Sequence, residues 1–305
     1  MPYHYSRRSG RKLKRKFEFF RFRFHFRAVN AVHFPAGKSG NLIRGALGRI
    51  LRDTASPAAY ARLFEPGRQL GPVPSGLGDW PRPFILRAGE LDGRTVPEGG
   101  RFSFDVHIFD LREAVPSYFH QAFAQFGGQG IGPGHGRAVL ERSEQVGLDD
   151  RPAPVDGAMP LVIDLDPGAW PPERETRRVE VRFLSPTELK SGGRVARKPE
   201  FAILFARLRD RIGALRALYG EGPLEIDFRG MGNRAASVRL SRCQVAWEKI
   251  ERKSGRTGQL HPLGGFTGWA EYEGDLAEFL PWLRAARWVG VGRQTVWGKG
   301  DVRVV

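Results

Sequence analysis

The sequence predicts an α+β fold of two βαββαβ units with antiparallel sheets. Apolar residues alternate with a period of two in some segments, which is typical of strands, and recur every three or four residues in others, which is typical of helices. The second half of the chain repeats the order of these segments in the first half, and each half finishes with a helix, a glycine-rich loop and a strand. The length of 305 residues fits about two domains.

The first strand and helix are the clearest elements of the first half. Phenylalanines at 20, 22, 24 and 26 alternate with basic residues, so we expect a strand with one face in the core and a basic face outside. Apolar residues over 42–51 then recur at helical spacing. Ser39 or Asn41 is expected to cap this helix, leaving its positive end beside Lys38.

The remaining elements follow the same two periodicities. In the first half we expect a loop-rich stretch over 66–100, a strand over 102–109, a helix over 117–126, a glycine-rich loop over 127–136 and a strand over 138–145. In the second half we expect a strand over 179–183, a helix over 199–219, strands over 237–250 and 264–273, a helix over 275–286, a glycine-rich loop over 290–300 and a strand over 301–305.

Composition divides the chain into four parts. Residues 1–16 carry seven basic residues and no acidic one, so we expect a disordered basic tail, which is either an arm that binds phosphates or a solvated end. Residues 17–146 and 177–305 form the two predicted domains. Residues 147–176 hold six prolines and are expected to connect them. The formal net charge of +16 favours a nucleic-acid partner over a membrane surface or an acidic protein.

Several functional classes are excluded or disfavoured. The single cysteine, Cys243, excludes internal disulfides and multi-cysteine metal sites, and it fits a reducing, cytoplasmic setting. We expect no metal site and no cofactor, because the sequence has no HExxH or HxH pair and no acidic cluster suited to magnesium. The sequence contains no run of about 18 apolar residues, so we expect no helix that spans a membrane. The segment 35–40 suggests a phosphate-binding loop, but that pattern needs a glycine five residues before Gly37. Val32 stands at that position, so we expect no nucleoside-triphosphate site.

The two glycine-rich loops and one histidine are the candidate functional features. Each loop follows a helix and opens a strand, which excludes a dinucleotide site and leaves either a tight turn or backbone contact with nucleic acid. His33 lies at the strand-to-helix junction, five residues before Lys38. A histidine there could transfer a proton while the lysine stabilises developing phosphate charge; the alternative is a surface or capping residue.

These segments resemble a known family. FRAVNAVHFPAGKSGNLIRGALGRILR (26–52), GQGIGPGHGRAVL (128–140), FLSPTELK (183–190) and the closing stretch 261–304 are similar to CRISPR-associated precursor-crRNA-processing endoribonucleases of the RAMP superfamily. AYARLFEP (59–66) and RPFIL (82–86) follow in the expected order. The resemblance covers almost everything after the basic tail.

The resemblance implies tandem ferredoxin-like, RRM-like domains and metal-free cleavage of CRISPR repeat RNA. In that reaction the 2′-hydroxyl attacks the adjacent phosphate and leaves a 2′,3′-cyclic phosphate. Many relatives carry a histidine where this chain has Arg49, and arginine is a poor general base. The catalytic candidates are therefore His33, Lys38, Arg44 and Arg49, with Tyr60 a further one. A non-catalytic RNA-binding subunit is the alternative, and an interaction scaffold whose charge only aids solubility is a third.

The expected RNA contacts lie on the first strand and on the two glycine-rich loops. They are Arg21, Arg23, Gly130, Gly132, Arg137, Gly290, Gly292, Arg293 and Lys299. Single-stranded or hairpin-flanking nucleotides are the expected ligand, since side chains cannot enter the narrow A-form major groove. The expected partner is CRISPR repeat RNA, with other CRISPR effector subunits as candidates; no DNA or membrane partner is expected.

Overall fold

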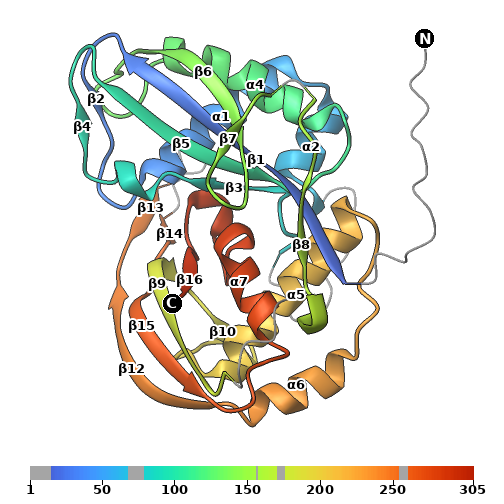
Figure 1. Ribbon diagram of the computed structural model, residues 1–305. Helices are drawn as coiled ribbons and strands as arrows, with labels where there is room; N and C mark the ends of the chain where they lie inside the picture. Colours follow the sequence, from blue (N-terminus) through green and yellow to red (C-terminus); the bar gives the residue numbers. More distant parts are fainter. Residues whose placement is uncertain (1–14, 68–78, 156, 170–175, 254–259) are drawn as a thin grey trace, which may run out of the picture.

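The protein has two sheets, each covered by helices on one face (Figure 1). The computed structural model describes residues 15–67, 79–155, 157–169, 176–253 and 260–305. Residues 1–14, which make up most of the predicted basic tail, lie outside the described residues. Every strand pairing in the two main sheets is antiparallel.

The first sheet has the strand order β3-β5-β1-β6-β7, and β8 pairs with the first part of β1. Helices α1 and α4 pack on one face of this sheet, and the second domain lies against the other (Figure 1). The elements are β1 (Lys16–Ala28), α1 (Ser39–Thr54), β3 (Phe84–Arg87), β5 (Arg101–Ile108), α4 (Val115–Phe126), β6 (Ala138–Val146), β7 (Pro152–Ala153) and β8 (Leu161–Asp164).

The second sheet has the order β12-β15-β9-β16, with α5 and α7 packed against it. The elements are β9 (Arg178–Thr187), α5 (Phe201–Tyr219), β12 (Arg239–Glu248), β15 (Gly265–Glu273), α7 (Leu280–Val289) and β16 (Val302–Val304). In both sheets the first strand of the βαββαβ unit lies between the third and the fourth, and the second strand lies beyond the third. This shared order confirms the prediction of tandem ferredoxin-like domains.

Smaller elements fill the connections. They are β2 (Val32–His33) paired with β4 (Thr95–Val96), α2 (Pro57–Phe64), β10 (Lys190–Ser191) with β11 (Arg194–Val195), α6 (Phe228–Ala236), and β13 (Glu251–Lys253) with β14 (Leu260–Pro262). The stretch 147–176, expected to connect the domains, contains β7 and β8, which belong to the first sheet. The helix expected from residue 275 begins only at Leu280, because turns occupy 277–279.

The alternation of β1 places its residues on two different faces. Phe22, Phe24 and Phe26 are fully buried and pack in the first core with α4. On the opposite face, Phe17 and Phe19 belong to the core of the second domain. The expectation of a basic outer face is wrong at Arg21, which is only 5% exposed, because the second domain covers this part of the sheet.

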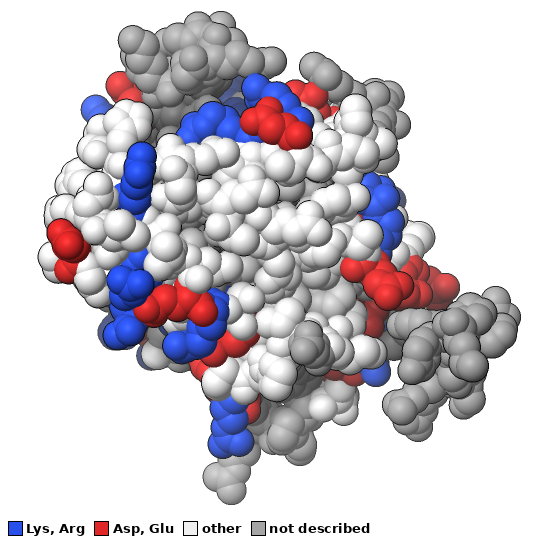
Figure 2. All heavy atoms as spheres, turned by 90° about the horizontal axis from the view of Figure 1, so that it is seen from above, with Lys and Arg blue, Asp and Glu red and all other residues white. Residues whose placement is uncertain are grey.

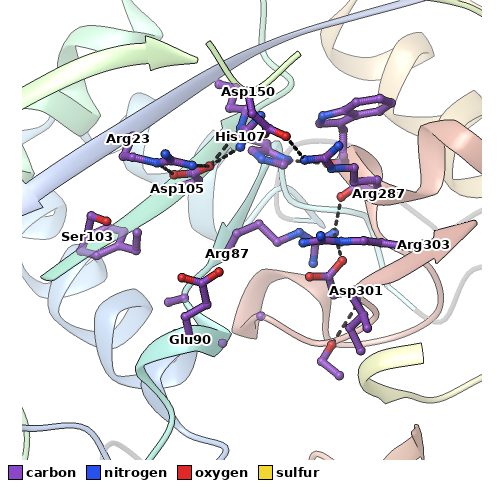
Figure 3. A pocket seen from close by; sticks show the side chains of 18 residues that line it. Arg23, Arg87, Glu90, Ser103, Asp105, His107, Asp150, Arg287, Asp301 and Arg303 are labelled. Atoms are coloured by element: carbon purple, nitrogen blue, oxygen red, sulfur yellow. Dashed lines mark hydrogen bonds and ion pairs between the residues drawn. The ribbon is translucent and has the colours of Figure 1, made fainter. Parts of the chain in front are cut away.

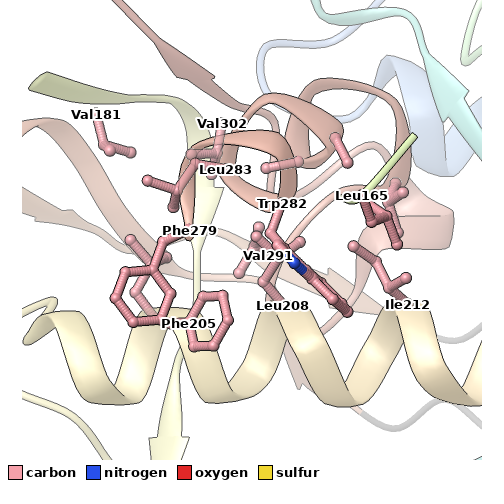
Figure 4. Packing of buried hydrophobic residues seen from close by; sticks show 14 of the residues in the cluster. Leu165, Val181, Phe205, Leu208, Ile212, Phe279, Trp282, Leu283, Val291 and Val302 are labelled. Carbon is pink, nitrogen blue, oxygen red and sulfur yellow. The ribbon is translucent and has the colours of Figure 1, made fainter. Parts of the chain in front are cut away.

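The second core lies between the second sheet and helices α5 and α7. Phe205 and Leu208 of α5 face Phe279, Trp282 and residues of the sheet (Figure 4). Because Phe17, Phe19, Ile85 and Phe109 of the first domain join this cluster, apolar packing continues across the domain boundary. This packing fixes the position of the second glycine-rich loop relative to α1.

Candidate nucleic-acid interface

His33 and Lys38 are both exposed and lie close together in sequence, just before α1 begins. His33 ends the short strand β2, and its Nδ1 lies 3.0 Å from the hydroxyl oxygen of Thr95 on β4. The Pro35–Ser39 turn then leads into the helix; Gly37 there adopts a positive φ of 65°. The imidazole and the ammonium are therefore available to a ligand at the same end of α1.

The cap of α1 differs from the expectation. Ser39 is the first helical residue rather than the cap, and it is 1% exposed. Its backbone N–H donates to Oδ1 of Asp92 at 2.9 Å, and its hydroxyl donates to the carbonyl of Ala88 at 2.8 Å. A carboxylate from a distant loop therefore compensates the positive end of the helix. The expected cap by a Ser39 or Asn41 side chain is wrong, since no side-chain cap bond forms at Lys38, the N-cap position.

The first glycine-rich loop packs directly on the segment that carries His33. A Cβ on Gly132, where φ is 71°, would lie 2.5 Å from the carbonyl oxygen of His33. A Cβ on Gly136 would lie 2.5 Å from the carbonyl of Ala31. Glycine is therefore required here for close packing between chain segments. Arg137, which follows the loop, is exposed.

The second glycine-rich loop contacts the same segment at Gly37 and Gly40, nearer to α1. A Cβ on Gly40 would lie 2.7 Å from the carbonyl oxygen of Trp297, and the ammonium of Lys299 donates to the carbonyl of Gly37 at 2.8 Å. A Cβ on Gly292 would lie 2.4 Å from the carbonyl oxygen of Glu188. Both loops thus contact residues 33–42, although many of their glycines serve packing within the protein.

The remaining loop candidates differ in exposure. Arg293 is 47% exposed and donates to the carboxylate of Glu188 at 2.7 Å. Lys299 is 3% exposed, so its ammonium faces the protein rather than solvent. Gly130 and Gly290 have positive φ values of 82° and 76°, which suit tight turns.

Arg44 and Arg49 lie farther along α1. The guanidinium of Arg44 is 5.1 Å from the ring centroids of both Phe64 and Trp297, and it lies between α2 and the second glycine-rich loop. Arg49 is exposed, but it lies eleven positions beyond Lys38, which is roughly 16 Å along a helix axis. The structure therefore does not bring Arg49 next to His33.

Arg21 and Arg23 face the second domain, across the first sheet from α1. Both donate to the buried carboxylate of Asp105, at 2.7 and 2.6 Å, and Arg21 also donates to Asp150 at 2.7 Å. Burial raises the pKa of Asp105, but the Arg23 hydrogen bond and the charge of Arg21 outweigh it and leave that pKa below its usual value. Asp150 bridges the domains, because it also accepts from Arg287 on α7 at 2.5 Å.

These arginines line a cavity of about 670 Å³ between the domains (Figure 3). Burial favours the neutral form of Asp150, yet the hydrogen bonds from Arg287 and Arg21 lower its pKa to about 2. Arg87 and Arg303 also face this cavity. Arg87, Arg287 and Arg303 were not predicted from the sequence, because their partners come from distant segments.

The surface is not uniformly basic. Seen from above, the centre of the molecule shows no charged side chains, and lysines and arginines form separate groups toward its edges (Figure 2). Among the residues that the structure describes, no group of three or more His, Cys, Asp or Glu could hold a metal ion. Within the same ranges, no helix is long and apolar enough to cross a membrane.

Comparison with protein families gives two matches, one in each half of the chain. Residues 181–302 match the family model of the CRISPR-associated endoribonuclease Cas6. Residues 17–156 match a model described as an N-terminal domain. No curated protein matches the chain significantly.

Solved structures with the same fold include several Cas6 proteins. A Cas6 product complex has 19% identity and a TM-score of 0.53, over 93% of this chain and 99% of that one. Thermus thermophilus Cas6 has 17% identity and a TM-score of 0.53, over 94% and 98%. A partial Cas6-RT-Cas1–Cas2 complex has 12% identity and a TM-score of 0.61, over 94% of this chain and 46% of that one. The resemblance predicted from the sequence is thus confirmed: the sequence of residues 181–302 matches the CRISPR-associated Cas6 endoribonuclease family, and both domains together have the fold of solved Cas6 structures.

Proposed function

We propose that the protein is an endoribonuclease that cleaves CRISPR repeat RNA in precursor crRNA. The observation that carries this proposal is that His33 and Lys38 are exposed at the start of α1, on the segment that both glycine-rich loops contact. The family match over 181–302 supports the substrate class. The formal charge of +16 supports an electrostatic contribution to RNA binding.

The proposed reaction needs no metal ion. The 2′-hydroxyl of the nucleotide before the cleaved bond gives its proton to His33, and its oxygen attacks the adjacent phosphorus. The bond from phosphorus to the 5′-oxygen breaks, that oxygen takes up a proton from solvent water, and the products are a 2′,3′-cyclic phosphate and a 5′-hydroxyl end. Thr95 orients the imidazole through Nδ1, which leaves Nε2 for the transfer. Lys38 stabilises the negative charge of the phosphorane.

Arg44 and Arg49 of α1 have secondary roles in this proposal. Arg44, held between two aromatic rings, supports the second glycine-rich loop. Arg49 adds positive charge farther along the RNA path. Arg137 and Arg293 contact phosphates beside the two loops. Gly130 and Gly290 allow the backbone to approach the RNA closely, whereas Gly132 and Gly292 hold the loops against the protein. The guanidinium of Arg23, with 32% of its side chain exposed, extends the basic surface to the interdomain cavity.

Repeat RNA is the first proposed partner, and other CRISPR proteins are further proposed partners. One solved structure of similar fold is a partial Cas6-RT-Cas1–Cas2 complex. We therefore propose that this chain also assembles with CRISPR proteins once its RNA is bound.

The test incubates the protein with the repeat RNA of its own genome in EDTA. We expect a discrete product ending in a cyclic phosphate. His33→Ala should lower the single-turnover rate by about 10²–10⁴-fold, because it removes the proton acceptor. Lys38→Met should also lower the rate, while Lys198→Met, which removes an exposed lysine before α5, should leave it unchanged.

Three outcomes would contradict the mechanism. A product that forms only with magnesium contradicts metal-free cleavage. A rate that is unchanged in His33→Ala assigns the proton transfer elsewhere. Tight, salt-dependent binding without any product favours the alternative of a non-catalytic RNA-binding subunit, for which Arg49 in place of a histidine is the argument.

A further inference from the structure

The turn between β2 and α1 is held by a lysine from the other domain. Lys299 follows the loop residue Gly298, and its ammonium donates to the carbonyl of Gly37 at 2.8 Å, across 262 residues of sequence. The side chain is almost completely removed from solvent, since Lys299 is 3% exposed. Lysine is seldom buried so deeply unless it is paired, so this contact calls for a specific role.

The cost of burying this ammonium is only partly compensated. Burial lowers the pKa of Lys299, and the charges of Asp92 and Glu248 oppose that effect. Asp92 also accepts from the backbone N–H of Ser39 at 2.9 Å. Lys299 and Asp92 therefore hold the same short turn from two sides, one through the Gly37 carbonyl and the other through the first amide of the helix.

Two glycines allow this close approach of the domains. Gly37 has a φ of 65°, and a Cβ there would lie 2.8 Å from Cδ1 of Ile250 in the second domain. A Cβ on Gly40 would lie 2.7 Å from the carbonyl oxygen of Trp297 and 3.2 Å from Cα of Gly298. We name the contacts of Ile250, Trp297, Gly298 and Lys299 with Gly37 and Gly40 the α1 joint.

We propose that Lys299 is a positioning residue, which sets the conformation of the turn between His33 and Lys38 through the Gly37 carbonyl. The inference rests on the proposed function for its consequence, because the two flanking side chains are the proposed catalytic groups. In this role the side chain of Lys299 does not contact the RNA. This assignment differs from a phosphate contact, which was the role expected from the sequence alone. A small displacement of either flanking group would slow the reaction without weakening RNA binding.

The test compares Lys299→Met with wild type and with Lys198→Met. Methionine keeps an apolar stem of similar length but cannot donate to the Gly37 carbonyl. We expect the single-turnover cleavage rate to fall by about 10²-fold, the RNA affinity and its salt dependence to stay unchanged, and amide hydrogen exchange over 36–41 to become faster. Lys198→Met should change none of these quantities.

A second variant alters the α1 joint at a residue of the first domain. Gly40→Ala places a methyl group against the Trp297 carbonyl and leaves Lys299 in place. It should likewise speed exchange over 36–41 and lower the cleavage rate while RNA affinity persists. This variant carries the test if Lys299→Met does not fold.

The outcomes separate the inference from the proposed function. A fall of about one in the salt slope of RNA binding for Lys299→Met would overturn the positioning role, because it indicates a lost phosphate contact. Unchanged rate and unchanged exchange would also overturn it. If the wild-type protein cleaves no RNA, the proposed function fails; faster exchange over 36–41 in Lys299→Met with unchanged RNA affinity would then still support the positioning of the turn.

Discussion

At the scale of single residues, three buried charged or polar side chains are each compensated by a specific hydrogen-bond partner. Arg21 is 5% exposed and pairs with Asp105 and Asp150. Lys299 donates to the Gly37 carbonyl. His107 is 3% exposed and donates from Nδ1 to the carbonyl of Trp288 at 2.7 Å. Each of these partners comes from a distant segment, so the domain interface depends on exact placement of a few polar atoms.

The protonation of His107 should affect stability. Burial, with the charge of Arg87, lowers its pKa to about 3. Below a pH of about 6.5 the unfolded chain binds a proton at this position that the folded chain does not, so the free energy of unfolding falls by about 1.4 kcal/mol per pH unit toward pH 3. His107→Asn keeps a donor near Nδ1 and does not titrate. In denaturant unfolding between pH 6.5 and 5, its free energy should therefore fall less steeply than that of wild type. Parallel curves would show that His107 is protonated equally in both states.

At the scale of elements, α1 is fixed at its first turn by groups from outside the helix. Asp92 compensates its N-terminus, and the second glycine-rich loop lies against Gly40. Farther along, the guanidinium of Arg44 lies between the rings of Phe64 and Trp297. The amphipathic pattern of α1 predicts the helix, whereas its orientation depends on these contacts.

Two glycines of α1 provide a matched pair of substitutions. Gly40→Ala should destabilise the protein by about 1–3 kcal/mol, because the added Cβ lies 2.7 Å from a backbone oxygen that cannot move freely. Gly45→Ala has no atom within 4 Å of the added Cβ, so it should stabilise the protein by up to about 1 kcal/mol through helix propensity. Urea unfolding of both variants measures the difference. Equal effects would mean that the contact with Trp297 does not constrain α1.

At the scale of the whole molecule, the two domains share an apolar core. Phe19 on β1 is fully buried, with its ring centroid 6.3 Å from that of Phe109 and 6.5 Å from that of Trp288 on α7. Asp150 adds an ionic bridge between Arg21 and Arg287. A large apolar interface of this kind couples the unfolding of the two domains.

Phe19→Ala tests this coupling. We expect a loss of about 3–5 kcal/mol and a single calorimetric transition at lower temperature, because the cavity weakens an interface on which both domains depend. Phe104→Ala, in the first core, should lower the same single transition. Two separate transitions, of which only one shifts in each variant, would show that the domains unfold independently.

The sequence by itself determined most of the main strands and helices and their order, although it missed β3, which lies in the stretch expected to be loop-rich, and helices α2 and α6. The alternation over 20–27 and the helical spacing over 42–51 follow from local backbone geometry, and both are present in the structure. The repeated order of segments was sufficient to predict two antiparallel βαββαβ domains. It also located His33, Lys38 and both glycine-rich loops, because a change from one periodicity to another marks a junction.

Only the tertiary structure decided which groups meet. The periodicity of β1 could not show that Phe19 packs into the other domain, or that Asp105 neutralises Arg21. It could not show that Lys299 binds the turn at Gly37. Periodicity records only which residues of one segment share a face, whereas the partner of that face is set by how distant segments pack and compensate buried charge.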